Sequence, residues 1–208
     1  MIEALPNSSL TLHAGSSIVA DFKVYVNGNL VYSDSNTRSV TPTITIPNAL
    51  GLHSLVVQVN QGTQSESDSI ILAANNAVGV NQNVIVIPAY PTNQDTIDIV
   101  YDSLNGNRGT QGYTPLYLHT GVLTQSGGTN WQNVQGNWGT DDNNVRLSHL
   151  GGGIWHKRLH VNSFYSLASI ASSVTHLAMV IRDSSGTHVG KTSSAGDILH
   201  PLAFSNNS

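Results

Sequence analysis

The first third of the chain alternates between apolar and polar residues. In residues 17–26 (SIVADFKVYV), Ile18, Ala20, Phe22, Val24 and Val26 fall on one face of an extended chain, because successive side chains of a strand point to opposite faces. This pattern predicts a half-buried β-strand. The composition of the next three residues (NGN) favours a tight hairpin turn. Further strand patterns follow at 39–46, 53–60 and 67–72.

A break in this alternation divides the chain. Residues 74–82 (ANNAVGVNQ) are mainly small or turn-forming, so we place a domain boundary there. Residues 164–174 have a helical period of apolar residues and predict a short connecting helix. We expect an all-β fold of two tandem antiparallel β-sandwich domains, residues 1–76 and 83–208. The second domain has strand patterns at 83–88, 95–102, 116–123, 145–150, 154–161, 176–183 and 197–202.

Composition and charge exclude several classes of function. Charged residues make up only 10% of the chain, and its formal net charge is -4. Without a basic surface we expect no nucleic acid and no anionic lipid as partner. The chain has no cysteine, so disulfides and cysteine nucleophiles are excluded. No apolar run approaches the roughly 20 residues of a membrane helix, and we expect no membrane span.

Catalytic signatures are absent from the sequence. It contains no GxSxG elbow, no phosphate-binding loop and no paired-histidine zinc helix. Most of the nine histidines alternate with apolar residues in strand patterns, which favours surface positions over a metal site. Asp141 and Asp142 are adjacent, which is typical of a solvated turn or a fragment of a calcium loop rather than of a glycosidase pair. We therefore predict no catalytic residue, no metal ligand and no cofactor.

The most informative segment is 116–138 (LYLHTGVLTQSGGTNWQNVQGNW). In a strand beginning at residue 116, Tyr117 and His119 share one face. Trp131 and Trp138 follow in polar segments that are poorly suited to a core. Rings beside amide side chains suit a neutral, hydroxyl-rich ligand, because a sugar ring can pack on an indole while its hydroxyls form hydrogen bonds. The four predicted ligand-binding residues are Tyr117, His119, Trp131 and Trp138.

Two further features favour structural roles. Trp155 lies in a strand pattern opposite His156 and Arg158, and core packing is the favoured interpretation. Arg182 and Asp183 end a strand before the turn SSG, where a pair that stabilises the turn is expected.

The second half resembles the carbohydrate-binding modules of secreted bacterial α-amylases and pullulanases of the Bacteroidetes type, and more distantly the starch-binding families 25 and 26. The resemblance covers residues 83–203, and its most specific parts are LYLHTGV and the following NW. It implies that Tyr117, His119 and Trp131 grip an α-glucan, with Trp138 as the counterpart of a further platform. The first half, with VYVNGNLVYS and GLHSLVVQVNQG, resembles immunoglobulin-like or fibronectin-like modules and implies a spacer.

Two functions of different kinds remain open. The first is non-catalytic binding of an α-glucan polysaccharide by an extracellular or cell-surface protein, as the accessory part of an amylolytic protein with a flanking catalytic domain. The alternative is a structural or adhesive β-sandwich protein, acting as spacer, surface appendage or self-assembling filament subunit without sugar binding. This alternative is motivated by the low charge and the many asparagine, serine and threonine residues. The predicted strands also have edges that could pair between chains. An enzyme ranks third.

Overall fold

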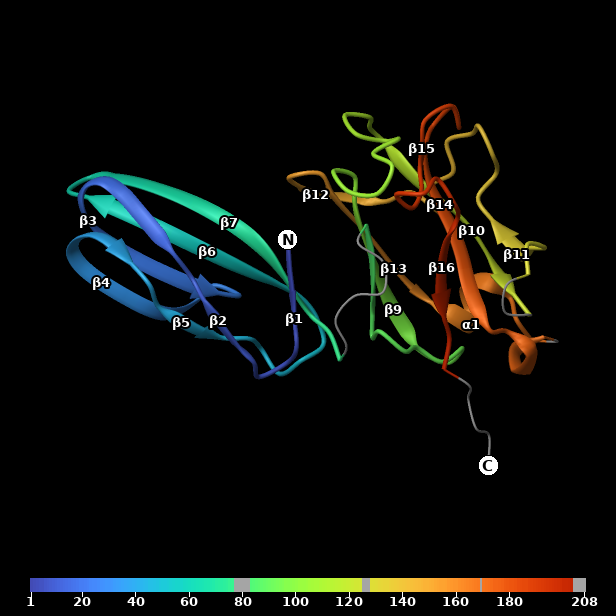
Figure 1. Ribbon diagram of the computed structural model, residues 1–208, viewed down its shortest axis with the longest axis horizontal. Helices are drawn as coiled ribbons and strands as arrows, with labels where there is room; N and C mark the ends of the chain where they lie inside the picture. Colours follow the sequence, from blue (N-terminus) through green and yellow to red (C-terminus); the bar gives the residue numbers. More distant parts are fainter. Residues whose placement is uncertain (77–82, 125–127, 169, 204–208) are drawn as a thin grey trace. The chain divides into compact units, whose positions relative to one another are not determined.

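The computed structural model describes residues 1–76, 83–124, 128–168 and 170–203, and most of them lie in β-strands. The chain divides into two compact units, Met1–Val78 and Gly79–Ser208, which are described separately below (Figure 1). Each unit is a β-sandwich with its own apolar core. Among the described residues, no helix is long and apolar enough to cross a membrane.

The first unit is built on a five-stranded sheet of order β1-β7-β6-β3-β4. All pairs in this sheet are antiparallel except β1 with β7, which is parallel. The strands β2 and β5 pair with each other in a separate two-stranded layer. The strands are β1 (Ile2–Ala4), β2 (Ser9–Thr11), β3 (Ala14–Val26), β4 (Asn29–Val40), β5 (Thr43–Thr45), β6 (Gly51–Gln61) and β7 (Gln64–Ala74).

The alternation predicted for residues 17–26 is confirmed in most of β3. Ala20, Phe22, Val24 and Val26 are all buried, as their shared face requires. Ile18 is an exception, with 44% of its surface exposed. The register between β3 and β4 shifts between Gly15 and Ala20, so the strand is irregular where Ile18 lies and the period no longer directs this side chain into the core.

The second unit packs two sheets face to face. One has the order β11-β10-β14-β15 with β16 also paired to β14, and the other has the order β12-β13-β9-β8. Strands β9, β10 and β14 are buried on nearly all positions, which explains their continuous apolar sequences. The strands are β8 (Val84–Ile87), β9 (Thr96–Asp102), β10 (Leu116–Leu123), β11 (Gln132–Gln135), β12 (Ser148–Gly151), β13 (Ile154–His160), β14 (His176–Asp183), β15 (Val189–Gly190) and β16 (Ile198–Pro201).

The helix predicted for residues 164–174 is wrong. The structure has a short helix α1 (Val161–Tyr165), and later one turn of 3-10 helix, η1 (Ala171–Ser173). His160 caps the start of α1, and Ser166 ends it by adopting the left-handed conformation at φ 55°. Leu167 and Val174 are buried although they lie outside a helix, so loop packing produces the apolar spacing that resembles a helical period.

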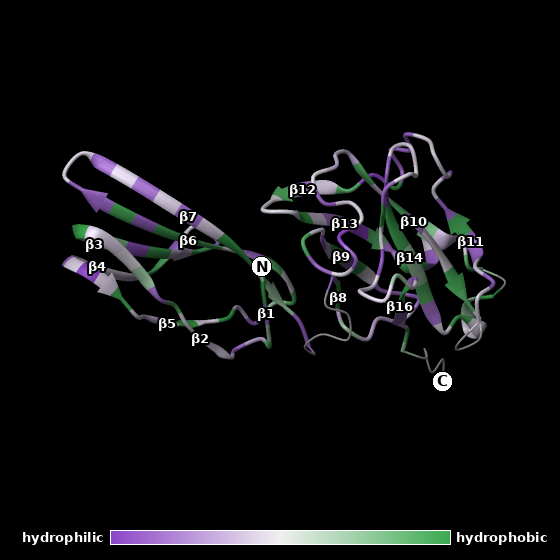
Figure 2. Ribbon diagram, turned by 45° about the horizontal axis from the view of Figure 1, so that its top comes forward, coloured by the Kyte–Doolittle hydropathy of each residue, from purple (hydrophilic) through white to green (hydrophobic). Residues whose placement is uncertain are grey.

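Hydropathy follows the packing of the strands. Figure 2 shows β7 changing from hydrophilic colours along its first half to hydrophobic ones along its second. The second half contributes Leu72 and Ala74 to the core of the first unit, whereas Glu66 and Asp68 in the first half are exposed. The core of the first unit therefore covers only part of its five-stranded sheet.

Candidate functional site

An open groove of about 400 Å³ lies on the second unit beside β10 and β14. His119 on β10 and Val180, its register partner on β14, both line it. Trp131, directly before β11, and Trp138, in the segment after β11, also line it, and Lys191 and Asp197 complete the polar part of the lining. The groove thus joins side chains from five separate segments of the chain.

Three of the four predicted residues meet in this groove. The ring centroids of His119 and Trp131 are 5.8 Å apart with 30° between the ring planes. The His119 and Trp138 centroids are 5.0 Å apart, with planes at 87°. Trp138 exposes 49% of its surface and Trp131 is half-buried, so both indoles remain accessible to a ligand.

The His119 ring is held in place by one backbone hydrogen bond. Its Nδ1 lies 2.7 Å from the carbonyl oxygen of Gly136. Because a carbonyl oxygen can only accept, Nδ1 carries the proton and donates. The Nε2 atom of the neutral ring is then an acceptor, able to receive a hydrogen bond from a ligand hydroxyl.

Two glycines allow the indoles to lie where they do. A Cβ on Gly121 would come 2.9 Å from the carbonyl oxygen of Gln132 and 3.2 Å from Cβ of Trp131. A Cβ on Gly186 would come 2.5 Å from Nε1 of Trp138, and this glycine also has φ +74°. The missing side chains therefore let β11 and the Trp138 indole approach the neighbouring backbone closely.

Tyr117 does not reach the groove. Its side chain is 0% exposed and belongs to the core cluster of the second unit, and the guanidinium carbon of Arg182 lies 5.0 Å from its ring centroid. Burial, reinforced by the nearby Asp141 carboxylate, raises the pKa of the Tyr117 hydroxyl. Among the described residues, that hydroxyl has no hydrogen-bond partner with acceptable geometry. Tyr117 shares a face of β10 with His119, but it is covered and cannot touch a ligand in the groove.

Arg182 positions the segment that carries Trp138. Its Nη2 donates to the carbonyl oxygens of Asn137 at 2.6 Å and Thr140 at 2.9 Å, and its Nη1 donates to that of Asp183 at 2.9 Å. Burial lowers the pKa of this guanidinium, while Tyr117 and nearby carboxylates oppose the shift. The expected side-chain pair between Arg182 and Asp183 is therefore wrong, because the guanidinium binds backbone carbonyls instead.

Asp183 does stabilise the turn that follows β14. Its carboxylate accepts hydrogen bonds from Ser185 Oγ, from the backbone N–H of Thr187 and from Nδ1 of His188. Burial acts to raise the pKa of Asp183, but the hydrogen bonds from the His188 ring, the Ser185 hydroxyl and the His188 backbone N–H outweigh it and lower the pKa to about 2. The turn includes Gly186, which the Trp138 indole approaches closely. The hydrogen bonds of Asp183 therefore help to fix the backbone against which Trp138 packs.

Sequence reasoning missed the ionic part of the groove. Nζ of Lys191 and Oδ1 of Asp197 form an ion pair at 3.0 Å, and both side chains are partly exposed. These residues lie about sixty positions after Trp131, and no motif connects them to it. The sequence indicated these two residues only by their charge, because charged residues are rare in this chain.

The other candidates lie outside the groove. Trp155 is buried in the core, as predicted, and stacks on His149 at 4.4 Å between centroids. Asp142 stabilises a turn by accepting from the backbone N–H of Asn144. His200 is only 5% exposed, so the surface position expected for it is wrong, because β16 directs it inward to the carbonyl oxygen of Ala89. Within the described ranges, no group of three or more histidine, aspartate or glutamate side chains could hold a metal ion.

Comparisons with known proteins give little guidance. No family model and no curated protein matches the chain. It is similar to the apo structure of Bacteroides uniformis beta-glucuronidase 3, with a TM-score of 0.31 and 11% identity over 97% of this chain and 23% of that one. The chain thus spans about a quarter of the length of that protein. It is also similar to a chimeric titin Z1Z2 carrying a KLER peptide from decorin, with a TM-score of 0.29 and 10% identity over 97% of this chain and 89% of that one. Neither similarity is close enough to indicate a function.

Proposed function

We propose that the second unit binds an α-glucan, such as starch or a maltooligosaccharide, without catalysis. The observation that carries this proposal is the meeting of His119, Trp131 and Trp138 in one open groove. The two indoles offer apolar faces for sugar rings, and Nε2 of His119 offers an acceptor for a hydroxyl. The Lys191–Asp197 pair adds a charged donor and a charged acceptor beside the rings.

The shallow site suits weak binding of a repeating polymer. Two accessible indoles and a few polar groups suggest a dissociation constant on the order of 10⁻⁴ M for a short oligosaccharide. Several such modules on one protein would increase retention on an insoluble substrate through avidity. In this proposal the protein is extracellular or on the cell surface, and the first unit is an immunoglobulin-like spacer before or beside a catalytic domain.

Replacement of Trp131 tests the proposal. Trp131→Ala removes the half-buried indole that lies nearest parallel to the His119 ring, so we expect at least about a tenfold loss of affinity. Affinity electrophoresis in gels containing soluble starch measures retention directly. Thermal unfolding of the same variant by circular dichroism should stay close to that of the wild type, because the side chain is not part of the core.

Tyr90→Ala provides the matched control. Tyr90 is an aromatic residue of the same unit with 55% exposure, and it does not line the groove. This variant should be retained by starch as well as the wild type. If the wild type is not retained by any α-glucan, or if Trp131→Ala binds normally, the groove is not a glucan site and the structural or adhesive function becomes the better candidate.

A further inference from the structure

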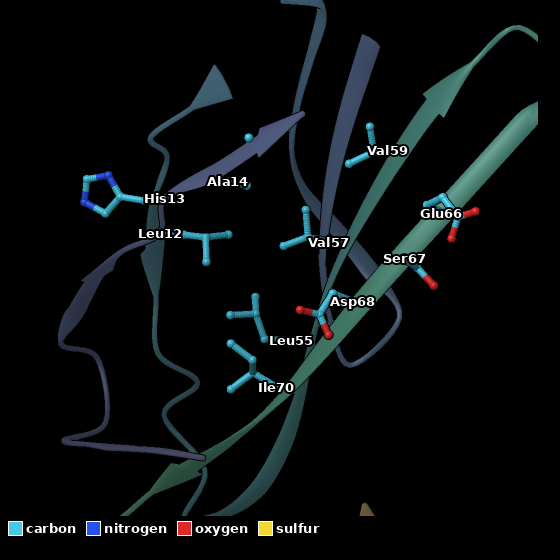
Figure 3. A pocket seen from close by; sticks show the side chains of 11 residues that line it. Leu12, His13, Ala14, Leu55, Val57, Val59, Glu66, Ser67, Asp68 and Ile70 are labelled. Atoms are coloured by element: carbon cyan, nitrogen blue, oxygen red, sulfur yellow. The ribbon is translucent and has the colours of Figure 1, made fainter. Parts of the chain in front are cut away.

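A second groove, of about 390 Å³, opens along one side of the first unit. Leu12 forms one wall, and Leu55, Val57 and Ile70 face it from β6 and β7 (Figure 3). An adjacent hollow of about 310 Å³ shares Gly15, Val59 and Glu66 with this groove. The two hollows therefore continue one another along β7, from Ile70 to Gln64.

The groove exists because the two layers of this unit differ in extent. The layer of β2 and β5 pairs over only three residues of each strand, whereas β6 and β7 pair over eleven. Beyond that short layer, Val57, Val59 and Ile70 are only half-buried although they point to the core side of the sheet. An apolar strip is thus left open beside the core, and exposed apolar strips of this kind favour a binding partner.

The backbone beside this strip has an open edge. Strand β7 pairs with β6 along its whole length, but on its other side β1 pairs only with residues 72–74. In the described part of the chain, residues 64–71 of β7 therefore have a strand on one side only. Their outward N–H and C=O groups are the hydrogen-bonding groups that an added strand uses.

The groove is also acidic. Glu66 and Asp68 line it, and Figure 3 shows the Asp68 carboxylate directed into the space between β7 and the wall that carries Leu12. Neither carboxylate takes part in an ion pair among the described residues. A segment that enters the groove with basic side chains would therefore meet two uncompensated negative charges.

We propose that this groove binds an extended, basic segment of another polypeptide, which adds as a strand to the free edge of β7. Apolar side chains of the segment pack on Val57 and Ile70, and its lysine or arginine side chains pair with Glu66 and Asp68. Inward-pointing charges on an edge strand can also serve to prevent strand addition. The two roles predict different results. Charges that protect the edge disfavour the addition of any strand, whereas a binding site favours a strand with basic side chains.

Synthetic peptides test this selectivity on the full chain. The probe is a dye-labelled peptide of seven residues. Threonine takes every second position, and valine and lysine take the positions between. The counterpart peptide has glutamate in place of lysine. At low salt we expect the lysine peptide to bind at least about tenfold more tightly in fluorescence anisotropy, with a smaller difference at high salt because exposed ion pairs are screened. Hydrogen exchange should show slower exchange of the amides of residues 64–71 when this peptide is bound.

Charge removal separates the groove from general attraction. The double variant Glu66→Gln with Asp68→Asn should bind the lysine peptide several-fold more weakly. The double variant Asp21→Asn with Asp34→Asn removes two exposed charges of the same unit outside the groove, and it should bind like the wild type. Equal binding of the two peptides, or unchanged exchange at 64–71, would overturn the proposal. Protection of these amides by concentration-dependent self-association would also overturn it, because the occupant would then be a second copy.

Discussion

Protonation of His200 should destabilise the second unit in mild acid. This residue lies on β16, and its Nε2 donates to the carbonyl oxygen of Ala89 at 2.9 Å. Burial lowers its pKa from 6.5 to about 4; His176 adds to this effect and the hydrogen bond to Ala89 opposes it. Since β16 directly follows Asp197 of the groove, the strand that depends on neutral His200 also places one wall of the proposed binding site.

The magnitude follows from proton linkage. Between pH 6.5 and about 4, His200 is protonated in the unfolded chain but still neutral in the folded chain. The contribution of neutral His200 to the free energy of unfolding is therefore fully present above this pH range and is lost as the pH falls through it. Each pH unit corresponds to about 1.4 kcal/mol, which gives a total loss of about 3 kcal/mol below pH 4. About 2 kcal/mol of that should already be lost at about pH 4.5.

Urea unfolding followed by tryptophan fluorescence provides the assay. All three tryptophans lie in the second unit, so the signal reports this unit alone. The variant His200→Gln can still donate to the Ala89 carbonyl but does not titrate. Its stability relative to the wild type should therefore improve by about 2 kcal/mol between pH 7 and about pH 4.5, because titration of all other groups is common to both proteins. An unchanged difference between the two proteins at both pH values would refute the reasoning.

Two further predictions concern packing around β10. Gly121→Ala places a Cβ 2.9 Å from the carbonyl oxygen of Gln132, so β11 and Trp131 must shift, with a stability cost of about 1–3 kcal/mol and weaker retention on starch gels. Gly196→Ala, where the nearest atom lies at 3.4 Å, is the control, and normal starch retention by Gly121→Ala would contradict the role assigned to Gly121. Thr120→Val should lower the free energy of unfolding, measured in urea, by about 1–3 kcal/mol. Thr120 Oγ1 donates to the carbonyl oxygen of Ala178 and lies 2.8 Å from the Tyr165 hydroxyl, so the substitution leaves that buried hydroxyl without this partner. Adding Tyr165→Phe should cost little more, and strictly additive losses would show that the two hydroxyls do not act as a pair.

Local pattern was sufficient to predict most strands of this protein. The strand predicted at 176–183 has the bounds of β14, and the one at 116–123 has those of β10. Alternation works because the period of a strand is a property of the backbone itself. It fails at Ile18 and between residues 164 and 174, where a register shift and a left-handed serine interrupt regular structure.

The candidate site could be predicted only in part. Trp131 and Trp138 were recognisable because rings in polar, glycine-rich segments are unusual in a core. His119 and Tyr117 were predicted together by a different argument, since both point to one face of β10. The Arg182 guanidinium lies over the Tyr117 ring and helps to cover that face there, whereas His119 lines the open groove.

The amino-acid sequence alone determined the strands, the faces they present and the kind of side chains available for binding, because these depend on neighbours one or two residues apart. Tertiary structure decided which of those side chains remain accessible, and it brought Lys191 and Asp197 to rings some sixty residues away. It also left residues 64–71 of β7 without a second neighbouring strand, because β1 pairs only with residues 72–74. Accessibility and proximity arise from packing between distant segments, and local periodicity does not encode them.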